Sequence, residues 1–163
     1  AMTAGYRRQR LFSLFDPWSD PLHTGWQAIQ AGVAMSNGGL WGMGLGASRA
    51  KWGFLPYAQT DFIFAIVAEE LGFVAAILVV LAFLAIGIIG LNTALRAPDR
   101  FGQLLAAGIT TWIVLQAYVN VGAVLGLLPI TGIPLPFLSY GGSSMVFTLT
   151  AYGVLLNIAR QTP

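Results

Sequence analysis

A run of apolar residues without a charge, from Leu71 to Leu91, most constrains how this chain folds. A stretch of about 20 such residues, wound as a helix, crosses the hydrocarbon core of a bilayer, which is about 30 Å thick. The helical pattern itself is longer, from Asp61 to about Arg96 without a proline, and would reach about 54 Å. The run therefore predicts one transmembrane span, whose first two turns project beyond the hydrocarbon or line a polar cavity.

The composition also indicates a membrane protein. The chain is 56% hydrophobic and 9% charged, whereas a soluble domain carries about 25% charged residues. Lipid therefore has to cover much of its surface. The net charge of +2 is too small and too scattered for binding to nucleic acid. The absence of cysteine excludes disulfides and thiolate chemistry, and the single histidine excludes a histidine-based metal cluster within this chain.

Two further spans follow the first. They are separated by LPITGIPLP (128–136), in which three prolines exclude a continuous helix. Such a broken backbone has to be buried in protein or to line a wet cavity. RAPDR (96–100) forms a polar turn. We therefore expect an all-α fold, a polytopic transmembrane helical bundle in residues 61–163. Its spans are predicted at about 61–95, 103–128 and 139–160.

Residues 1–60 are predicted to be a large loop at a membrane face, with one short amphipathic helix at 25–36. Four of the five tryptophans lie here, and tryptophan favours that depth. The glycines of GGLWGMGLG (38–46) predict tight loop packing, with an anion-binding nest as the alternative. Because the chain starts without Met, we expect it to be a fragment that lacks upstream spans. Five of the eight basic residues lie in this loop, so a simple charge count places it in the cytoplasm.

Three acidic residues stand out near the start of the first span. Asp61 is expected at headgroup depth, where it could meet both water and a lipid head. The simpler interpretation is that Thr60 or Asp61 caps the helix. Glu69 and Glu70 begin the apolar run, where carboxylates are usually paired or line a cavity. We favour a structural role for both glutamates, through an ion pair with an arginine of the loop.

Other polar residues allow two interpretations each. Arg49 and Lys51 could hold phosphate oxygens or be attracted to anionic lipid headgroups. Gln116 and Asn120 lie one helical turn apart, and we interpret them as hydrogen-bonding residues that hold helices together rather than as substrate ligands. SYGGSS (139–144) places small residues at a helix N-terminus, which permits close helix approach or binding of a negative group.

Together these segments resemble the SEDS family of bacterial cell-wall polymerases (shape, elongation, division and sporulation). The matching stretches cover nearly the whole chain in family order: FDPWSDP, GGLWGMGLGASRAKWGFLPYAQTDFIFAIVAEELGF, YVNVGAVLGLLPITGIPLPFLSYGGSS and LLNIAR. The pattern is more similar to the division members than to the elongation members. The resemblance implies that the chain is the C-terminal third to half of a longer protein. It also places residues 1–60 outside the cell, against the charge count.

The resemblance implies a peptidoglycan glycosyltransferase that polymerises lipid II at the outer face of the bacterial cytoplasmic membrane during division. It implies that Asp61 is the essential loop aspartate. The division members of some bacteria have lysine where this chain has Thr131, so another cation would have to contact substrate phosphate here. The candidate substrate-binding residues beside Asp61 are Ser48, Arg49, Lys51, Gln59, Thr60, Ser139 and Ser143.

The expected partners are lipid II, membrane lipid, a class B penicillin-binding transpeptidase and other division proteins, and no nucleic acid. No cofactor is fixed by the resemblance, and a divalent cation (Mg²⁺ or Mn²⁺) held by Asp61 on the diphosphate is the alternative to general-base catalysis by that residue. Two rival functions stay open. One is a transporter that flips lipid II, since broken helices and polar intramembrane residues are also transporter features. The other is a non-catalytic scaffold for the transpeptidase.

Overall fold

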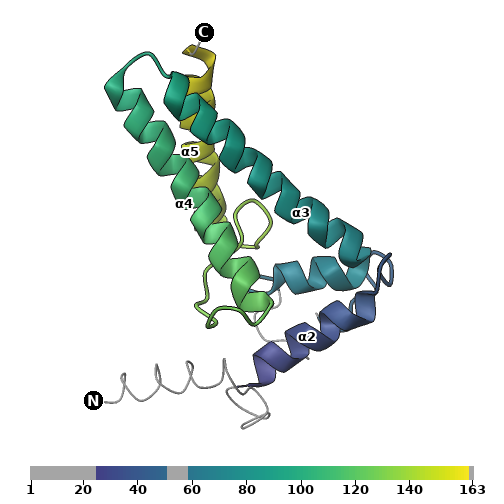
Figure 1. Cartoon of the computed structure of the whole chain (residues 1–163). Coiled ribbons are helices and arrows are strands. Elements are labelled where there is room, and N and C mark those ends of the chain that lie inside the picture. The colour runs from purple at the N-terminus through teal and green to yellow at the C-terminus, as the bar shows by residue number, and fades with distance from the viewer. Residues whose placement is uncertain (1–24, 51–58, 162–163) are drawn as a thin grey trace, which may run out of the picture.

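The computed structural model of the chain describes residues 25–50 and 59–161, and its regular elements there are helices. They are α2 (Trp26–Gly38), α3 (Ile63–Arg96), α4 (Arg100–Val124) and α5 (Gly142–Gln161), shown in Figure 1. Helices α3, α4 and α5 are long and apolar enough to cross a membrane. The prediction of an all-α, polytopic membrane fold is confirmed.

Helix α3 is broken where the sequence predicted a continuous rod. Gly72 has φ 82° and ψ −179°, a non-helical conformation that divides the helix into two segments. Figure 1 shows the short first segment lying across the base of the long second segment. The first two turns after Asp61 therefore leave the axis of the span, and only the segment after Gly72 follows it.

The glycine-rich loop between α2 and the described residue Ala50 holds this kink. The carbonyls that end one helical segment and the amides that begin the next lack partners within their own segments. Here the loop supplies those partners to both. The hydrogen bonds run from Met43 N to Glu69 O (3.0 Å), Gly44 N to Glu70 O (3.0 Å), Phe73 N to Gly39 O (2.9 Å) and Val74 N to Leu40 O (3.4 Å). The prediction of tight loop packing is confirmed, because loop amides bind helix carbonyls rather than an anion.

Helix α4 packs against both α3 and α5. An added Cβ at Gly90 of α3 would come 2.2 Å from Thr110 Oγ1 of α4, so the two helices approach closely at this point. Small residues allow such an approach between membrane helices. The buried stripe of α4 repeats every three or four residues and consists of Gly102, Ala106, Thr110, Ile113, Ala117 and Asn120.

Both ends of α4 are set by local chemistry. Asp99 caps the first turn, since its Oδ2 accepts from Gly102 N at 2.7 Å. The helix ends at Val124 rather than at the predicted 128, because Gly126 takes φ 72°. The chain then folds back, and the amides of Leu127 and Leu128 donate to Gly122 O. The 96–100 turn lies at the end of the bundle opposite the start of α3 (Figure 1).

Candidate active site at the start of helix α3

Asp61 lies in the turn that leads into α3, not on the helix. The N-cap of the helix is Phe62, whose side chain makes no capping hydrogen bond and is 1% exposed. The expectation that Thr60 or Asp61 caps the helix is wrong. Both residues precede the capping position, and the buried ring of Phe62 fixes this end of the helix instead.

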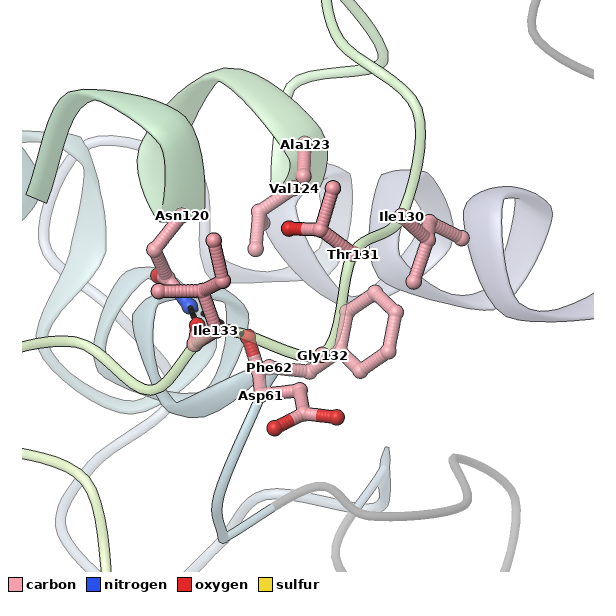
Figure 2. A pocket seen from close by; sticks show the side chains of 9 residues that line it. All are labelled: Asp61, Phe62, Asn120, Ala123, Val124, Ile130, Thr131, Gly132 and Ile133. Atoms are coloured by element: carbon pink, nitrogen blue, oxygen red, sulfur yellow. Dashed lines mark hydrogen bonds between the residues drawn. The ribbon is translucent and has the colours of Figure 1, made fainter. Parts of the chain in front are cut away.

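The carboxylate of Asp61 has unused capacity to bind a ligand. Asp61 is half-buried, and its carboxylate accepts no hydrogen bond from the residues that the structure describes. Figure 2 shows the carboxylate pointing away from the side chain of Asn120. A half-buried carboxylate with free acceptor positions is available to a hydroxyl group or a cation.

The backbone around Asp61 is held by two segments from the second half of the chain, the residues before α5 and helix α4. The amide of Tyr140 donates to Gln59 O at 2.9 Å. The hydroxyl of Ser139 donates to Thr60 O at 2.5 Å, and Asn120 Nδ2 donates to Asp61 O at 2.8 Å. Three successive carbonyls are therefore bound, which fixes the backbone of the turn, whereas the Asp61 carboxylate accepts no hydrogen bond from residues 25–50 and 59–161.

The proline-rich segment (128–136) lies beside this turn and is buried only at its end, whereas Thr131 and Gly132 are exposed. Leu135 is 1% exposed, and its amide donates to Ser139 Oγ at 2.6 Å. Two amides of α4 hold the segment further: Gln116 Nε2 donates to Pro134 O at 2.9 Å and Asn120 Nδ2 to Ile133 O at 2.7 Å. The two amides thus join α4 to this segment and, through Asn120, to the turn of Asp61, whereas the sequence had suggested contact between helices.

A small recess that opens to solvent lies where these segments meet. Gly132 has φ 72°, and an added Cβ there would lie 3.5 Å from Asp61 Oδ2. A glycine at this position therefore leaves room beside the carboxylate. The lining residues are Asp61, Phe62, Asn120, Ala123, Val124, Ile130, Thr131, Gly132 and Ile133 (Figure 2).

Glu69 occupies a second polar cluster, which the kink brings against the loop. Its side chain is 1% exposed. It accepts from Ser48 Oγ at 2.5 Å and from the amides of Arg49 and Ala50 at 3.3 and 3.4 Å. Among the described residues its partners are therefore these groups, and the expected ion pair with an arginine side chain is not formed. Glu70 accepts from Ser48 N at 3.3 Å.

We expect Glu69→Gln to lower the folded yield of the complete protein without removing its activity per folded molecule. The new amide NH₂ would face the hydroxyl or amides that now donate to the carboxylate, and a hydrogen bond to a charged group contributes about 1.5–3 kcal/mol. Size-exclusion chromatography and thermal unfolding in detergent measure the yield and the stability. A Glu69→Gln protein with normal stability and no activity would contradict this and move Glu69 into the active site.

The remaining candidate residues divide between the two clusters. Around Asp61 lie Gln59, which is exposed, Thr60, which is half-buried, and Ser139, which is buried with its hydroxyl bonded within the chain. Ser143 is exposed at the start of α5. Around Glu69 lie buried Ser48 and exposed Arg49, whereas Lys51 lies outside the described residues.

Sequence reasoning missed the backbone contacts that build the site. The spacing of Gln116 and Asn120 showed that they share a helix face, but not that Asn120 binds Asp61 O. The positive φ of Gly132 beside Asp61 had only the proline-rich pattern as a signal. In the part of the chain that the structure describes, no three acidic, histidine or cysteine residues gather as metal ligands.

The fold and the site define a class: a multi-pass helical membrane protein with a half-buried carboxylate in a turn at one end of its bundle. A family model described as "cell cycle protein", which covers FtsW, RodA and SpoVE, matches residues 1–163. The chain therefore belongs to the FtsW/RodA/SpoVE family, as its motifs indicated.

Named relatives agree with this assignment. Stage V sporulation protein E of Bacillus subtilis is 52% identical over 161 residues, which are 99% of this chain and 44% of that protein. A probable peptidoglycan glycosyltransferase FtsW of Geobacter metallireducens is 49% identical, over 98% of this chain and 43% of that protein. The corresponding protein of Mycobacterium tuberculosis is 46% identical, over 100% and 31%.

A solved structure shares the fold. It belongs to a study of how a peptidoglycan synthase complex coordinates polymerisation and crosslinking, and it matches with a TM-score of 0.72 and 32% identity. The match covers 95% of this chain and 42% of the solved chain. The chain thus spans less than half the length of these relatives.

Proposed function

We propose that the complete protein is a peptidoglycan glycosyltransferase that polymerises lipid II into glycan strands during cell division. The observation that carries this proposal is the half-buried carboxylate of Asp61, unpaired among the described residues, on a turn fixed at three successive carbonyls. A catalytic group has to be held in a fixed position and has to be available to bind the reacting atoms. The names of the relatives support the reaction class.

The proposed reaction needs one proton acceptor. The 4-hydroxyl oxygen of the acceptor sugar forms a bond to C1 of the donor sugar, while the bond from C1 to the diphosphate oxygen breaks. The diphosphate leaves with the bonding electrons, and the hydroxyl proton passes to Asp61. A well-placed general base accelerates such a step by about 10²–10⁴-fold.

The leaving diphosphate needs positive charge nearby. Arg49, exposed beside the Glu69 cluster, and Lys51 are the candidate cations of this chain. A divalent cation held by Asp61 on the diphosphate is the second candidate role for this carboxylate. A chelator added to the polymerisation assay separates the two roles, because a base needs no cation whereas a cation ligand does.

The proposal places the active site at the outer face of the cytoplasmic membrane, as the family resemblance implies. The turn of Asp61 and the 96–100 turn belong to opposite ends of the bundle. The proposal places residues 1–60 outside the cell and the 96–100 turn inside. It also includes a class B penicillin-binding transpeptidase as partner, which the solved complex of polymerisation and crosslinking supports.

The deciding experiment gives purified complete protein lipid II in detergent, with and without the transpeptidase. We expect glycan strands to form, because detergent leaves no two sides between which a lipid could be moved and polymerisation does not need them. A protein that moves lipid II across vesicle membranes but forms no strands in detergent would be a transporter. Retained binding of the transpeptidase without any strand product would indicate a scaffold.

A further inference from the structure

We propose that Asn120 is a positioning residue for Asp61: its side-chain amide ties the backbone of Asp61 to the proline-rich segment and so sets where the carboxylate meets substrate. This inference rests on the proposed function. It assigns Asn120 no contact with substrate, and its effect passes entirely through Asp61.

The orientation of the Asn120 amide is settled by its partners. The side chain is 3% exposed, and Nδ2 donates both to Asp61 O at 2.8 Å and to Ile133 O at 2.7 Å. Both partners are carbonyls, which only accept, so the nitrogen has to face them. One amide group therefore connects α4, the turn of Asp61 and the proline-rich segment.

The oxygen of the same amide is unpaired within the part of the chain that the structure describes. Asn120 Oδ1 is buried and accepts no hydrogen bond from these residues. Buried polar atoms are normally paired, and an unpaired one is unfavourable for stability. An asparagine here therefore stabilises the fold less than a side chain with all its polar atoms paired. Unpaired groups of this kind are typical of functional sites.

The peptide groups on both sides of Asp61 are anchored. The carbonyl of Thr60 belongs to the peptide group before Asp61 and is bound by Ser139 Oγ. The carbonyl of Asp61 belongs to the peptide group after it and is bound by Asn120. Each peptide group is planar, so anchoring both leaves the backbone dihedrals of Asp61 little freedom. The direction of its Cα–Cβ bond is thereby fixed, and only the side-chain torsions stay free.

Gln116 provides a matched control within the same helix. It lies one turn before Asn120 and also donates an amide hydrogen bond to the proline-rich segment, at Pro134 O. Within the described part of the chain, no hydrogen bond joins Gln116 to Asp61. Replacing either residue by alanine removes an amide–carbonyl contact between α4 and the same segment, but only Asn120→Ala releases the peptide group that follows Asp61.

The test measures kcat and KM for lipid II polymerisation by the complete protein with its transpeptidase partner in detergent. We expect Asn120→Ala to lower kcat by about 10²-fold, the effect of a catalytic group misplaced by about 1 Å, with KM little changed. Gln116→Ala is expected to stay close to wild type. Thermal unfolding of both variants corrects for folded protein. Should Asn120→Ala fail to fold, Asn120→Gln keeps the donors on a longer arm and is expected to lower kcat in the same way.

A double-mutant cycle with Asp61→Glu tests whether the effect passes through Asp61. The longer side chain already misplaces the carboxylate, so Asn120→Ala is expected to reduce its residual rate much less than it reduces the wild-type rate. Equal losses of kcat in Asn120→Ala and Gln116→Ala would overturn the proposal. A higher KM with unchanged kcat in Asn120→Ala would overturn it as well. The proposed function fails on a different observation, namely the absence of glycan strands when the complete wild-type protein is given lipid II in detergent.

Discussion

Asp61→Asn in the complete protein is expected to abolish polymerisation of lipid II while leaving membrane insertion and folding intact. The carboxylate accepts no hydrogen bond from the described residues, so a side chain of the same shape loses no internal contact there. The backbone bonds that hold the turn do not depend on the side chain of Asp61. What disappears is the proton acceptor, whose contribution as a general base is about 10²–10⁴-fold.

Strand formation by Asp61→Asn is measured on gels against purified wild-type protein at equal concentration. Asp99→Asn is the matched control, because it makes the same chemical change at the other end of the bundle. Asp99 caps α4 through Gly102 N, and asparagine caps a helix about as well as aspartate. This control should polymerise normally. Near-normal strand formation by Asp61→Asn would remove Asp61 from the mechanism.

The membrane spans were predictable because their signal is local. Each depends on a run of apolar residues and on the prolines or charges that end it, and the structure has helices at all three places. The ends were less predictable. Helix α4 stops at Val124 because Gly126 takes a positive φ and Leu127 and Leu128 fold back onto Gly122. A glycine within an apolar run does not by itself predict that a helix ends there.

The break in α3 was not predictable, because its cause lies far away in the sequence. Gly72 stands in a helical pattern without proline, and its non-helical conformation depends on partners supplied by Gly39, Leu40, Met43 and Gly44. The glycines of that loop did predict close packing. The sequence did not show what they pack against.

The candidate site was also predictable only in part. Asp61 was identified because its surrounding motif resembles a known family, and its depth was consistent with the length of the helical pattern. The partners of the polar residues were not accessible, because helical spacing shows which residues share a face and not what that face meets. Asn120 therefore looked like a contact between helices, and Glu69 like half of an ion pair, whereas both bind backbone groups of loops or turns.

Gly72→Ala is expected to cause the largest loss of folded protein. The combination of φ 82° and ψ −179° is essentially restricted to glycine, and strain of this kind costs about 1–3 kcal/mol. An added Cβ would also come 2.4 Å from Gly42 N and from Leu40 O, which are backbone atoms that cannot swing aside. The loop would have to move, and each lost hydrogen bond to the kink would cost about 1 kcal/mol more.

Gly32→Ala is the control for Gly72→Ala, since an added Cβ at Gly32 in α2 meets nothing within 4 Å. Alanine favours a helix, so this variant should be at least as stable as wild type. Yield, monodispersity and thermal unfolding in detergent compare the two, and wild-type values for Gly72→Ala would contradict the prediction.

Activity gives an independent measure, because the short segment from Ile63 to Leu71 carries the turn of Asp61 at its start. Straightening α3 at residue 72 would swing that turn by about the length of the segment, about 13 Å, so the protein that still folds should not polymerise.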